Sequence, residues 1–353
     1  MSIIFAILLF SLLIFVHELG HFMAAKASGV QVNEFAMFMG PAIWKKQKGE
    51  TLYSIRCIPI GGYCAMEGED SDTESPRSFQ KAAWWKRFFI LIAGSAMNLL
   101  IGLLIMLIVY MPAKQYAVPE IVTFEAGCTL NGEGGLQVGD RIIEVDGERI
   151  YTQSDVTMIL TVKGGDVHDL VVERNGVKVT LNNFKMEKHE FSNPDGSVSL
   201  RYGFSFGYDE ATFGNKLKQV VNETMSVIRS TRLSLQMLFQ GKAGLKDMTG
   251  PVGIVGAMSD VAESSRTTLD AVMNMLYLGA FIAINLAVMN MLPIPALDGG
   301  RVFALLITTA ITAITKKEID PKYEGYIHAA GMVLLLVLMA LIMFKDIFTI
   351  IKG

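Results

Sequence analysis

The sequence predicts a polytopic α-helical membrane protein with four transmembrane helices, a small membrane-associated β-hairpin and one inserted extracytoplasmic β-rich domain. Hydrophobic residues make up 51% of the 353 residues, and the mean hydropathy is +0.40. Charged residues make up only 18%, whereas soluble proteins contain about 25%. The apolar residues are gathered in long blocks, which excludes a purely soluble protein. The net charge of -3 and the absence of a nucleic-acid motif exclude a nucleic-acid partner.

Four apolar segments are long enough to span a bilayer. The first runs from about Ser2 to Ala25 and the second from about Phe88 to Met111. The third covers about Ala271 to Leu292 and continues past a Pro/Gly break into Val302–Ala313. The fourth is Ile327–Phe344. An even number of spans places both termini on the same side of the membrane.

Lysine and arginine residues in the short loops predict the orientation of these spans. The first loop contains Lys45, Lys46, Lys48, Arg56, Arg77, Lys81, Lys86 and Arg87, and the last contains Lys316, Lys317 and Lys322. Because cytoplasmic loops are enriched in these residues, both loops are expected in the cytoplasm. The termini and the β-rich domain are then extracytoplasmic.

The end of the first apolar segment contains the motif His17-Glu18-Leu19-Gly20-His21. On a helix, the two imidazoles lie on one face at the spacing that Zn²⁺ requires. Glu18 lies beside the metal, where it can act as a base toward a bound water. Ionisable residues in an apolar helix are costly and mark functional sites. We therefore expect one zinc ion, with His17 and His21 as ligands.

A third protein ligand is expected, because catalytic zinc sites usually have three protein ligands and one position for water. Pro293 and Pro295 break the third apolar segment, and broken helices in a bilayer line cavities. Asp298 lies in this break and is the expected third ligand, since a lone carboxylate in a membrane needs a cation. The alternative for Asp298 is a helix cap. For His328, the other candidate ligand, an interfacial or packing role is preferred.

Two stretches of the first loop predict short strands, Val30–Phe38 and Thr51–Tyr63, the second ending in a Gly61-Gly62 turn. A small sheet beside the metal would offer an edge to which an extended peptide adds by main-chain hydrogen bonds. A plain connector is the alternative.

The polar region from about Lys114 to Asp270 begins with a compact β-rich domain. Its expected elements are a hairpin within Gly135–Ile150, a helix near Thr152–Val162, and strands at Val167–Val172 and Val177–Leu181. His168 and His189 are expected at its surface. Asn215–Phe239 has a helical period with basic residues, which favours an amphipathic helix on the membrane surface. An ordinary helix that caps the soluble domain is the alternative.

The motif His17–His21, together with Asn290-x-x-Pro293-x-Pro295-x-Leu297-Asp298-Gly299, resembles the site-2 protease family of intramembrane zinc metalloproteases (peptidase family M50), in its bacterial RseP-type branch. Further similar motifs are Ile58-Pro-Ile-Gly-Gly-Tyr63, Arg77-x-Phe79, Trp85-x-Arg87 and Ala93-Gly94-x-x-x-Asn98. The Gly135–Ile150 stretch resembles a PDZ domain of the circularly permuted bacterial kind. Two departures from the family are Ser95, where a proline is usual, and a single PDZ-like unit.

The resemblance implies a protease of the bacterial inner membrane, and the orientation expected from the loops places its active site toward the cytoplasm. Its substrates would be transmembrane segments of membrane proteins, such as anti-sigma factors or remnant signal peptides. Glu18 would transfer the proton from water to the leaving amine. Asn290 would donate a hydrogen bond to the substrate backbone or oxyanion. Gly61, Gly62 and Tyr63, with Pro293 and Pro295, would bind the substrate.

The expected domains are 1–113 (helices 1 and 2 with the zinc motif and β loop), 114–187 (PDZ-like), 188–270 (β segment and surface helix) and 271–353 (helices 3 and 4). The PDZ-like domain would bind a peptide or a protein C-terminus. The alternative function is a non-catalytic zinc-binding membrane protein with a peptide-sensing PDZ domain. Closed structural zinc sites normally have four protein ligands, often cysteines, and the three cysteines here show no such spacing.

Overall fold

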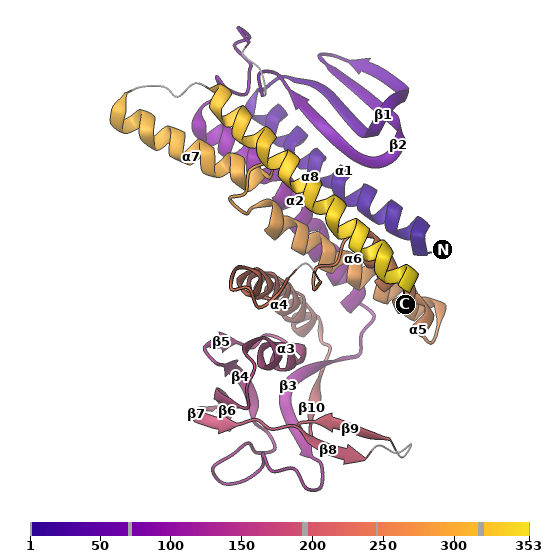
Figure 1. Ribbon diagram of the computed structural model, residues 1–353, viewed down its shortest axis with the longest axis vertical. Coiled ribbons are helices and arrows are strands. Elements are labelled where there is room, and N and C mark those ends of the chain that lie inside the picture. The colour runs from indigo at the N-terminus through magenta and orange to yellow at the C-terminus, as the bar shows by residue number, and fades with distance from the viewer. Residues whose placement is uncertain (1, 70–72, 193–196, 245, 317–320, 353) are drawn as a thin grey trace. The chain divides into compact units, whose positions relative to one another are not determined.

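The computed structural model describes the chain except for residues 1, 70–72, 193–196, 245, 317–320 and 353 (Figure 1). The chain divides into two compact units. One combines Met1–Met106 with Gly241–Gly353 and contains most of the apolar helices, whereas the other is Leu107–Gln240.

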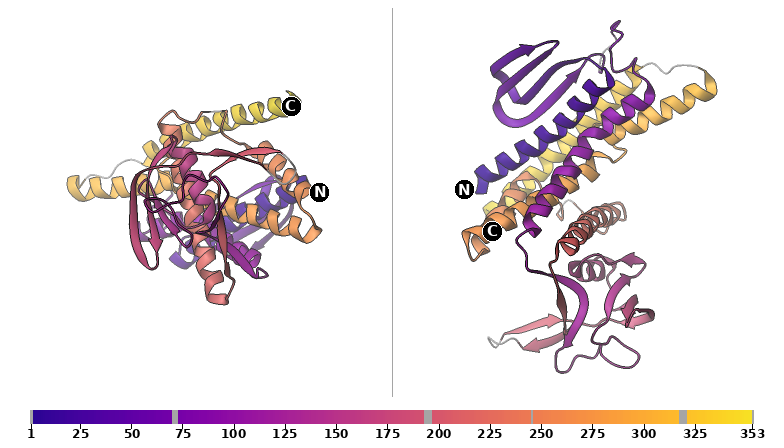
Figure 2. Two further views of the ribbon diagram at one scale, coloured as in Figure 1. Left: turned by 90° about the horizontal axis from the view of Figure 1, so that it is seen from below. Right: turned by 180° about the vertical axis from the view of Figure 1, so that it is seen from behind.

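The first unit is built mainly from helices. They are α1 (Ser2–Ser28), α2 (Trp84–Tyr110), α5 (Pro251–Ser264), α6 (Thr268–Asn290), α7 (Asp298–Thr315) and α8 (Pro321–Lys352). Figures 1 and 2 show the N-terminal end of α1 and the C-terminal end of α8 at the same end of this unit.

Five of the described helices are long and apolar enough to cross a membrane. They comprise Ile4–Ser28, Trp84–Tyr110, Thr268–Asn290, Asp298–Thr315 and Gly325–Thr349. The predicted apolar segments are therefore all helical. The third segment divides at its Pro/Gly break into α6 and α7, and the count of four spans stays a prediction.

Small residues bring α1, α2 and α6 close together. A Cβ atom on Gly20 would lie 2.4 Å from the carbonyl oxygen of Ala93, so α1 and α2 meet at this glycine. A Cβ on Gly102 would lie 2.7 Å from Cγ1 of Ile284, where α2 meets α6. Close packing of small residues is a main source of helix association in lipid, where no hydrophobic driving force acts between helices.

Strands β1 (Val32–Lys48) and β2 (Thr51–Met66) form an antiparallel sheet beside α1. The sheet confirms the two predicted strands, but both are longer than predicted. The prediction that the second strand ends at Gly61-Gly62 was wrong. Gly61 has φ +83, and this left-handed conformation bends β2 so that it continues to Met66. Glu34 of β1 consequently pairs with both Leu52 and Ala65.

The second unit contains a sheet with the strand order β10-β3-β4-β6-β7, and β5 pairs with β4. Its strands are β3 (Gln115–Phe124), β4 (Arg141–Val145), β5 (Glu148–Arg149), β6 (Val167–Arg174), β7 (Val177–Lys185) and β10 (Phe204–Glu210). A separate hairpin pairs β8 (His189–Ser192) with β9 (Val198–Arg201), and α3 covers Gln153–Lys163. The predicted hairpins, strands and helix are present.

The turns of this unit follow from its Asp-Gly and Asn-Gly pairs. Asp146 and Asn175 both have positive φ values, 49° and 51°, and each is followed by a glycine with positive φ. Two consecutive residues with positive φ are typical of the two-residue turns that match the twist of a hairpin.

β10 pairs with β3 at the edge of the sheet. The sheet therefore includes residues beyond 187, where the sequence prediction ended the PDZ-like domain.

The prediction that His168 is a surface residue was wrong. Only 2% of His168 is exposed, its Nδ1 lies 2.7 Å from Oδ2 of Asp146, and its Nε2 lies 3.1 Å from the carbonyl oxygen of Gly165. In β6, His168 alternates with exposed residues and shares the inward face with Leu170 and Val172. Because strand side chains alternate between faces, the alternation of His168 with Leu170 and Val172 could have predicted from the sequence that His168 is buried.

Helix α4 (Phe213–Phe239) packs against α3 and adds Leu233 to the hydrophobic core of the unit. Arg229 forms a buried ion pair with Asp155 of α3, as expected for a helix that caps the domain. An apolar stripe of α4 is exposed and consists of Phe213, Leu217, Val221 and Met225. A membrane-surface position for this stripe stays a prediction.

Replacing Arg229 with methionine is expected to lower the free energy of unfolding of the Leu107–Gln240 unit by about 3 kcal/mol, because the buried carboxylate of Asp155 loses its cation. Amide hydrogen exchange in β4 and β6 of the full chain measures this loss. The matched control is Arg232→Met. Arg232 is 54% exposed and pairs with Glu148, so its loss should cost less than about 1 kcal/mol. Equal effects of the two variants would contradict a special role for the buried pair.

Candidate active site

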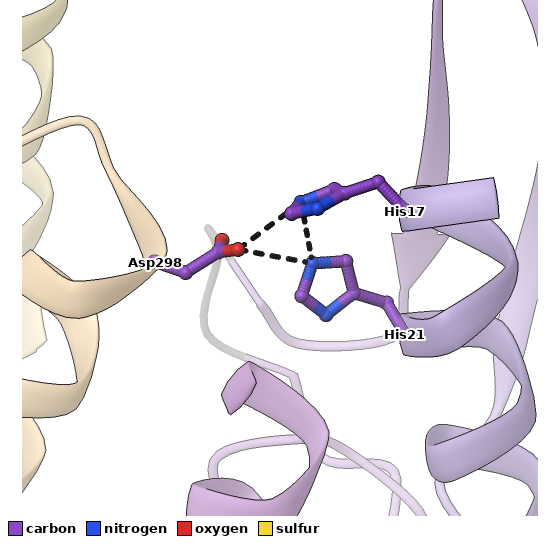
Figure 3. A group of neighbouring side chains, drawn as sticks. All are labelled: His17, His21 and Asp298. Atoms are coloured by element: carbon purple, nitrogen blue, oxygen red, sulfur yellow. Dashed lines mark hydrogen bonds and ion pairs between the residues drawn. The ribbon is translucent and has the colours of Figure 1, made fainter. Parts of the chain in front are cut away.

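His17 and His21 lie one turn apart on α1 and point toward Asp298 at the start of α7 (Figure 3). The Nε2 atoms of the two histidines are 3.1 Å apart. Oδ2 of Asp298 lies 3.1 Å from Nε2 of His17 and 3.3 Å from Nε2 of His21. The fold thus brings together the three predicted ligands, which are separated by most of the chain.

These three atoms fit a zinc ion. With metal–ligand bonds of about 2.1 Å, ligands of a tetrahedral zinc site are separated by about 3.4 Å, close to the observed distances. Oδ2 of Asp298 is buried, and its close polar neighbours among the described residues are the two imidazole Nε2 atoms. A buried carboxylate grouped with two imidazole nitrogens is a suitable set of ligands for a cation, which would compensate the cost of burying the charge. The same observation argues against the alternative in which this oxygen caps α7.

The loop between α6 and α7 fixes the position of Asp298. A Cβ on Gly299 would lie 2.3 Å from the carbonyl carbon of Met291, and a Cβ on Gly300 would lie 2.2 Å from the carbonyl oxygen of Ile294. The first turn of α7 therefore packs directly on the preceding backbone, which only glycine allows. The loop contains Pro293 and Pro295 and follows Asn290, the last residue of α6.

Helix α2 packs directly against the two histidines. The sequence analysis did not predict this contact. Nδ1 of His21 lies 2.8 Å from the carbonyl oxygen of Ile90, and Nδ1 of His17 lies 3.2 Å from Nδ2 of Asn98. A Cβ on Gly94 would lie 2.4 Å from Nε2 of His21. The spacing Gly94-x-x-x-Asn98 could have predicted this packing, because it places a small residue and a polar residue on the same face of a helix.

Glu18 lies beside the predicted substrate-binding edge. A Cβ on Gly62 would lie 3.6 Å from Cγ of Glu18, so β2 passes directly over this side chain. Residues 62–66 pair with β1 on one side only, and no further strand covers their other side within the described residues. Tyr63 lies in this segment, with the guanidinium group of Arg56 5.2 Å from its ring centre.

His328 lies outside the metal cluster and contacts the loop that leads to Asp298. Its Nδ1 accepts a hydrogen bond from the backbone N–H of Ala296, at 3.1 Å. Ala296 has φ +79, an uncommon conformation for a residue with a side chain. Gly331, one turn along α8, packs against Pro295. These contacts support the packing role that the sequence favoured for His328.

An ion pair between Glu69 and Arg301 connects the segment after β2 to the first turn of α7. Sequence reasoning missed it, because nothing in either local pattern indicates that these residues meet. It joins the two elements that flank the cluster of His17, His21 and Asp298.

Comparison with known proteins decides the family. The model of peptidase family M50 matches residues 5–338. The chain belongs to peptidase family M50. This confirms the predicted resemblance to the site-2 protease family, and with it a zinc-dependent peptidase of the site-2 protease type.

Several curated relatives match over nearly their whole length. A Clostridium acetobutylicum protein described as a candidate zinc metalloprotease is 35% identical over 98% of this chain and 97% of its own length. A similarly described protein of Clostridium perfringens is 34% identical over 98% of both chains. The zinc metalloprotease RasP of Geobacillus kaustophilus is 27% identical over 98% of this chain and 97% of its own length.

Proposed function

We propose that this protein is an intramembrane zinc metalloprotease that cleaves transmembrane segments of membrane proteins, such as anti-sigma factors or remnant signal peptides. The convergence of His17, His21 and Asp298 within helices apolar enough to cross a membrane is the observation that carries this proposal. Their ligand atoms all lie within 4.8 Å of one another. Membership of a peptidase family supports hydrolysis as the reaction.

In this proposal His17, His21 and Asp298 hold the metal, and Glu18 is the catalytic base. A bound zinc ion would act as a Lewis acid that makes water more acidic and polarises the scissile carbonyl. Glu18 takes the proton from the attacking water and delivers it to the leaving amine. Asn290, at the end of α6, donates a hydrogen bond to the substrate backbone or oxyanion.

The substrate is proposed to bind as an extended strand along residues Gly61, Gly62 and Tyr63. A transmembrane helix satisfies its own amides, so it must unwind before a peptide bond can be attacked. The uncovered edge of β2 offers main-chain partners to the unwound segment. The closeness of the Gly62 backbone to Glu18, where an added Cβ would lie 3.6 Å from Cγ, supports this arrangement, since it would deliver the segment to the base. Pro293 and Pro295 would line the opposite side.

For the membrane topology we propose four spans, with both termini and the PDZ-like domain outside the cytoplasm of a bacterial cell. The first loop and the last loop would then lie in the cytoplasm, with the active site near that side. The domain limits proposed from the sequence are 1–113, 114–187, 188–270 and 271–353, with β10 (Phe204–Glu210) of the third segment completing the sheet of the PDZ-like domain. The location of both helix ends at one end of the helical unit supports this topology.

The PDZ-like domain is proposed to bind a peptide between α3 and the edge strand β10. A cavity lies between these elements, lined by Gln153, Ser154, Thr157, Lys188, Leu200, Arg201, Tyr202, Phe204 and Phe206. Strand addition at a sheet edge beside a helix is a common mode of peptide recognition. No observation favours the alternative of a non-catalytic zinc protein.

Removing zinc is expected to abolish cleavage of a single-pass reporter protein by the purified enzyme in lipid vesicles. Because the cluster contains three zinc ligands and no redox group, adding one equivalent of Zn²⁺ should restore cleavage. Cleavage is measured by gel mobility of the reporter and zinc content by metal analysis. Undiminished cleavage by zinc-free enzyme would contradict the proposal. A His17→Ala variant controls for contaminating proteases.

A further inference from the structure

Asn98 is a fully buried polar residue in the middle of α2, with none of its surface exposed. Its side-chain amide lies against His17, with 3.2 Å between Nδ2 of Asn98 and Nδ1 of His17. Its Oδ1 has no hydrogen-bond partner among the described residues. A buried amide in an apolar helix is costly, so its position against a metal-binding histidine requires a reason.

The positions of protons on the two imidazoles provide this reason. A histidine that binds a metal through Nε2 must carry its proton on Nδ1, and a hydrogen bond to Nδ1–H fixes the ring. For His21 the partner is the carbonyl oxygen of Ile90, which can only accept. For His17 the partner is the amide of Asn98, which donates through Nδ2 or accepts through Oδ1.

These two orientations of the amide have opposite consequences for His17. If Nδ2 donates to Nδ1, the ring carries its proton on Nε2, the atom that faces Asp298 and the metal position. If Oδ1 accepts from Nδ1–H, the lone pair of Nε2 is free for the metal. The 3.2 Å separation allows either orientation, because a half-turn of the amide exchanges the two atoms.

We propose that Asn98 is a positioning residue for the zinc site, which accepts the Nδ1–H of His17 through Oδ1 in the zinc-loaded protein. It selects the tautomer of His17 and holds the ring toward Asp298, as Ile90 does for His21. This inference rests on the proposed role of His17 as a zinc ligand. It gives a residue of α2 a role in the zinc site, although the three proposed ligands lie on α1 and α7.

The test measures zinc affinity of the full-length protein in detergent, by competition with a chelator, and the visible absorption of the Co²⁺-substituted form. Replacing Asn98 with alanine should weaken zinc binding about 10- to 100-fold, the usual effect of losing such a partner. Asn98→Asp has nearly the same shape and an ionised carboxylate that can only accept, so it should bind zinc at least as tightly as the wild type. Ser95→Ala is the matched control, since Ser95 is also buried in α2 and its hydroxyl has no hydrogen-bond partner among the described residues.

A merely structural role gives a different result. In that case Asn98→Ala would lower the melting temperatures of the zinc-free and zinc-loaded proteins equally and leave zinc affinity unchanged, which would overturn the proposal. Zinc binding by Asn98→Asp as weak as that of Asn98→Ala would also overturn it. If the alanine variant does not fold, Asn98→Leu fills the same space without a hydrogen bond and is expected to show the same loss of affinity. A wild-type protein that binds no zinc, or a His17→Ala variant that binds it normally, would instead refute the proposed metal site.

Discussion

A Glu18→Gln variant is expected to lose about 10²- to 10⁴-fold in the rate of reporter cleavage while it keeps its zinc. Glutamine has nearly the same shape as glutamate, but its amide does not take a proton from water. Glu18 is not part of the cluster of His17, His21 and Asp298, so the metal ligands remain intact. Single-turnover cleavage of the reporter in vesicles, with metal analysis of the same sample, measures both quantities.

Glu67→Gln is the matched control for this variant. Glu67 directly follows β2, accepts hydrogen bonds from Asn33 and Thr73, and is not part of the cluster of His17, His21 and Asp298. Its replacement should leave cleavage unchanged. If Glu18→Gln cleaved at the wild-type rate, Glu18 would not be the base, and another group would have to move the proton. If it lost both zinc and activity, the residue would have a structural role at the metal instead.

The grouping of His17, His21 and Asp298 could be predicted from the sequence because it follows from local chemistry. The spacing of His17 and His21 fixes them on one face of any helix, and a carboxylate at a Pro/Gly break in an apolar segment calls for a cation. The distance between Asp298 and the histidines then follows from folding. Similar local rules predicted the hairpin within Gly135–Ile150, whose turn lies at Asp146 and Gly147.

The rest of the site depends on which helices and strands meet, which no local pattern contains. The contact of Asn98 with His17 and the ion pair between Glu69 and Arg301 each join segments far apart in the chain. The edge position of β10 in the sheet of the Leu107–Gln240 unit is also of this kind, because its partner β3 lies about a domain length earlier. His168 differs, since the alternation of β6 shows its inward position.

The metal site also depends on a residue that contributes no side chain, and Gly94→Ala is expected to abolish zinc binding and proteolysis. The new Cβ would lie 2.4 Å from Nε2 of His21 and 2.8 Å from Nε2 of His17, where it would crowd both ligand atoms. Glycine in the interior of a helix is otherwise destabilising by about 0.5–1 kcal/mol relative to alanine, so the backbone of α2 itself favours the substitution.

Gly94→Ala should therefore stabilise helix α2 while it prevents zinc binding, so a loss of zinc could not be explained by unfolding of the helix. Gly256→Ala is the control, because Gly256 lies in α5 and an added Cβ would meet no atom of another described segment within 4 Å, so that variant should bind zinc and cleave normally. The Gly94→Ala protein should remain helical by circular dichroism but contain no zinc after chelator exchange. Full zinc occupancy in this variant would mean that α2 can move away from α1 without disturbing the zinc ligands. Close contact of α2 with His17 and His21 would then not be required for the site.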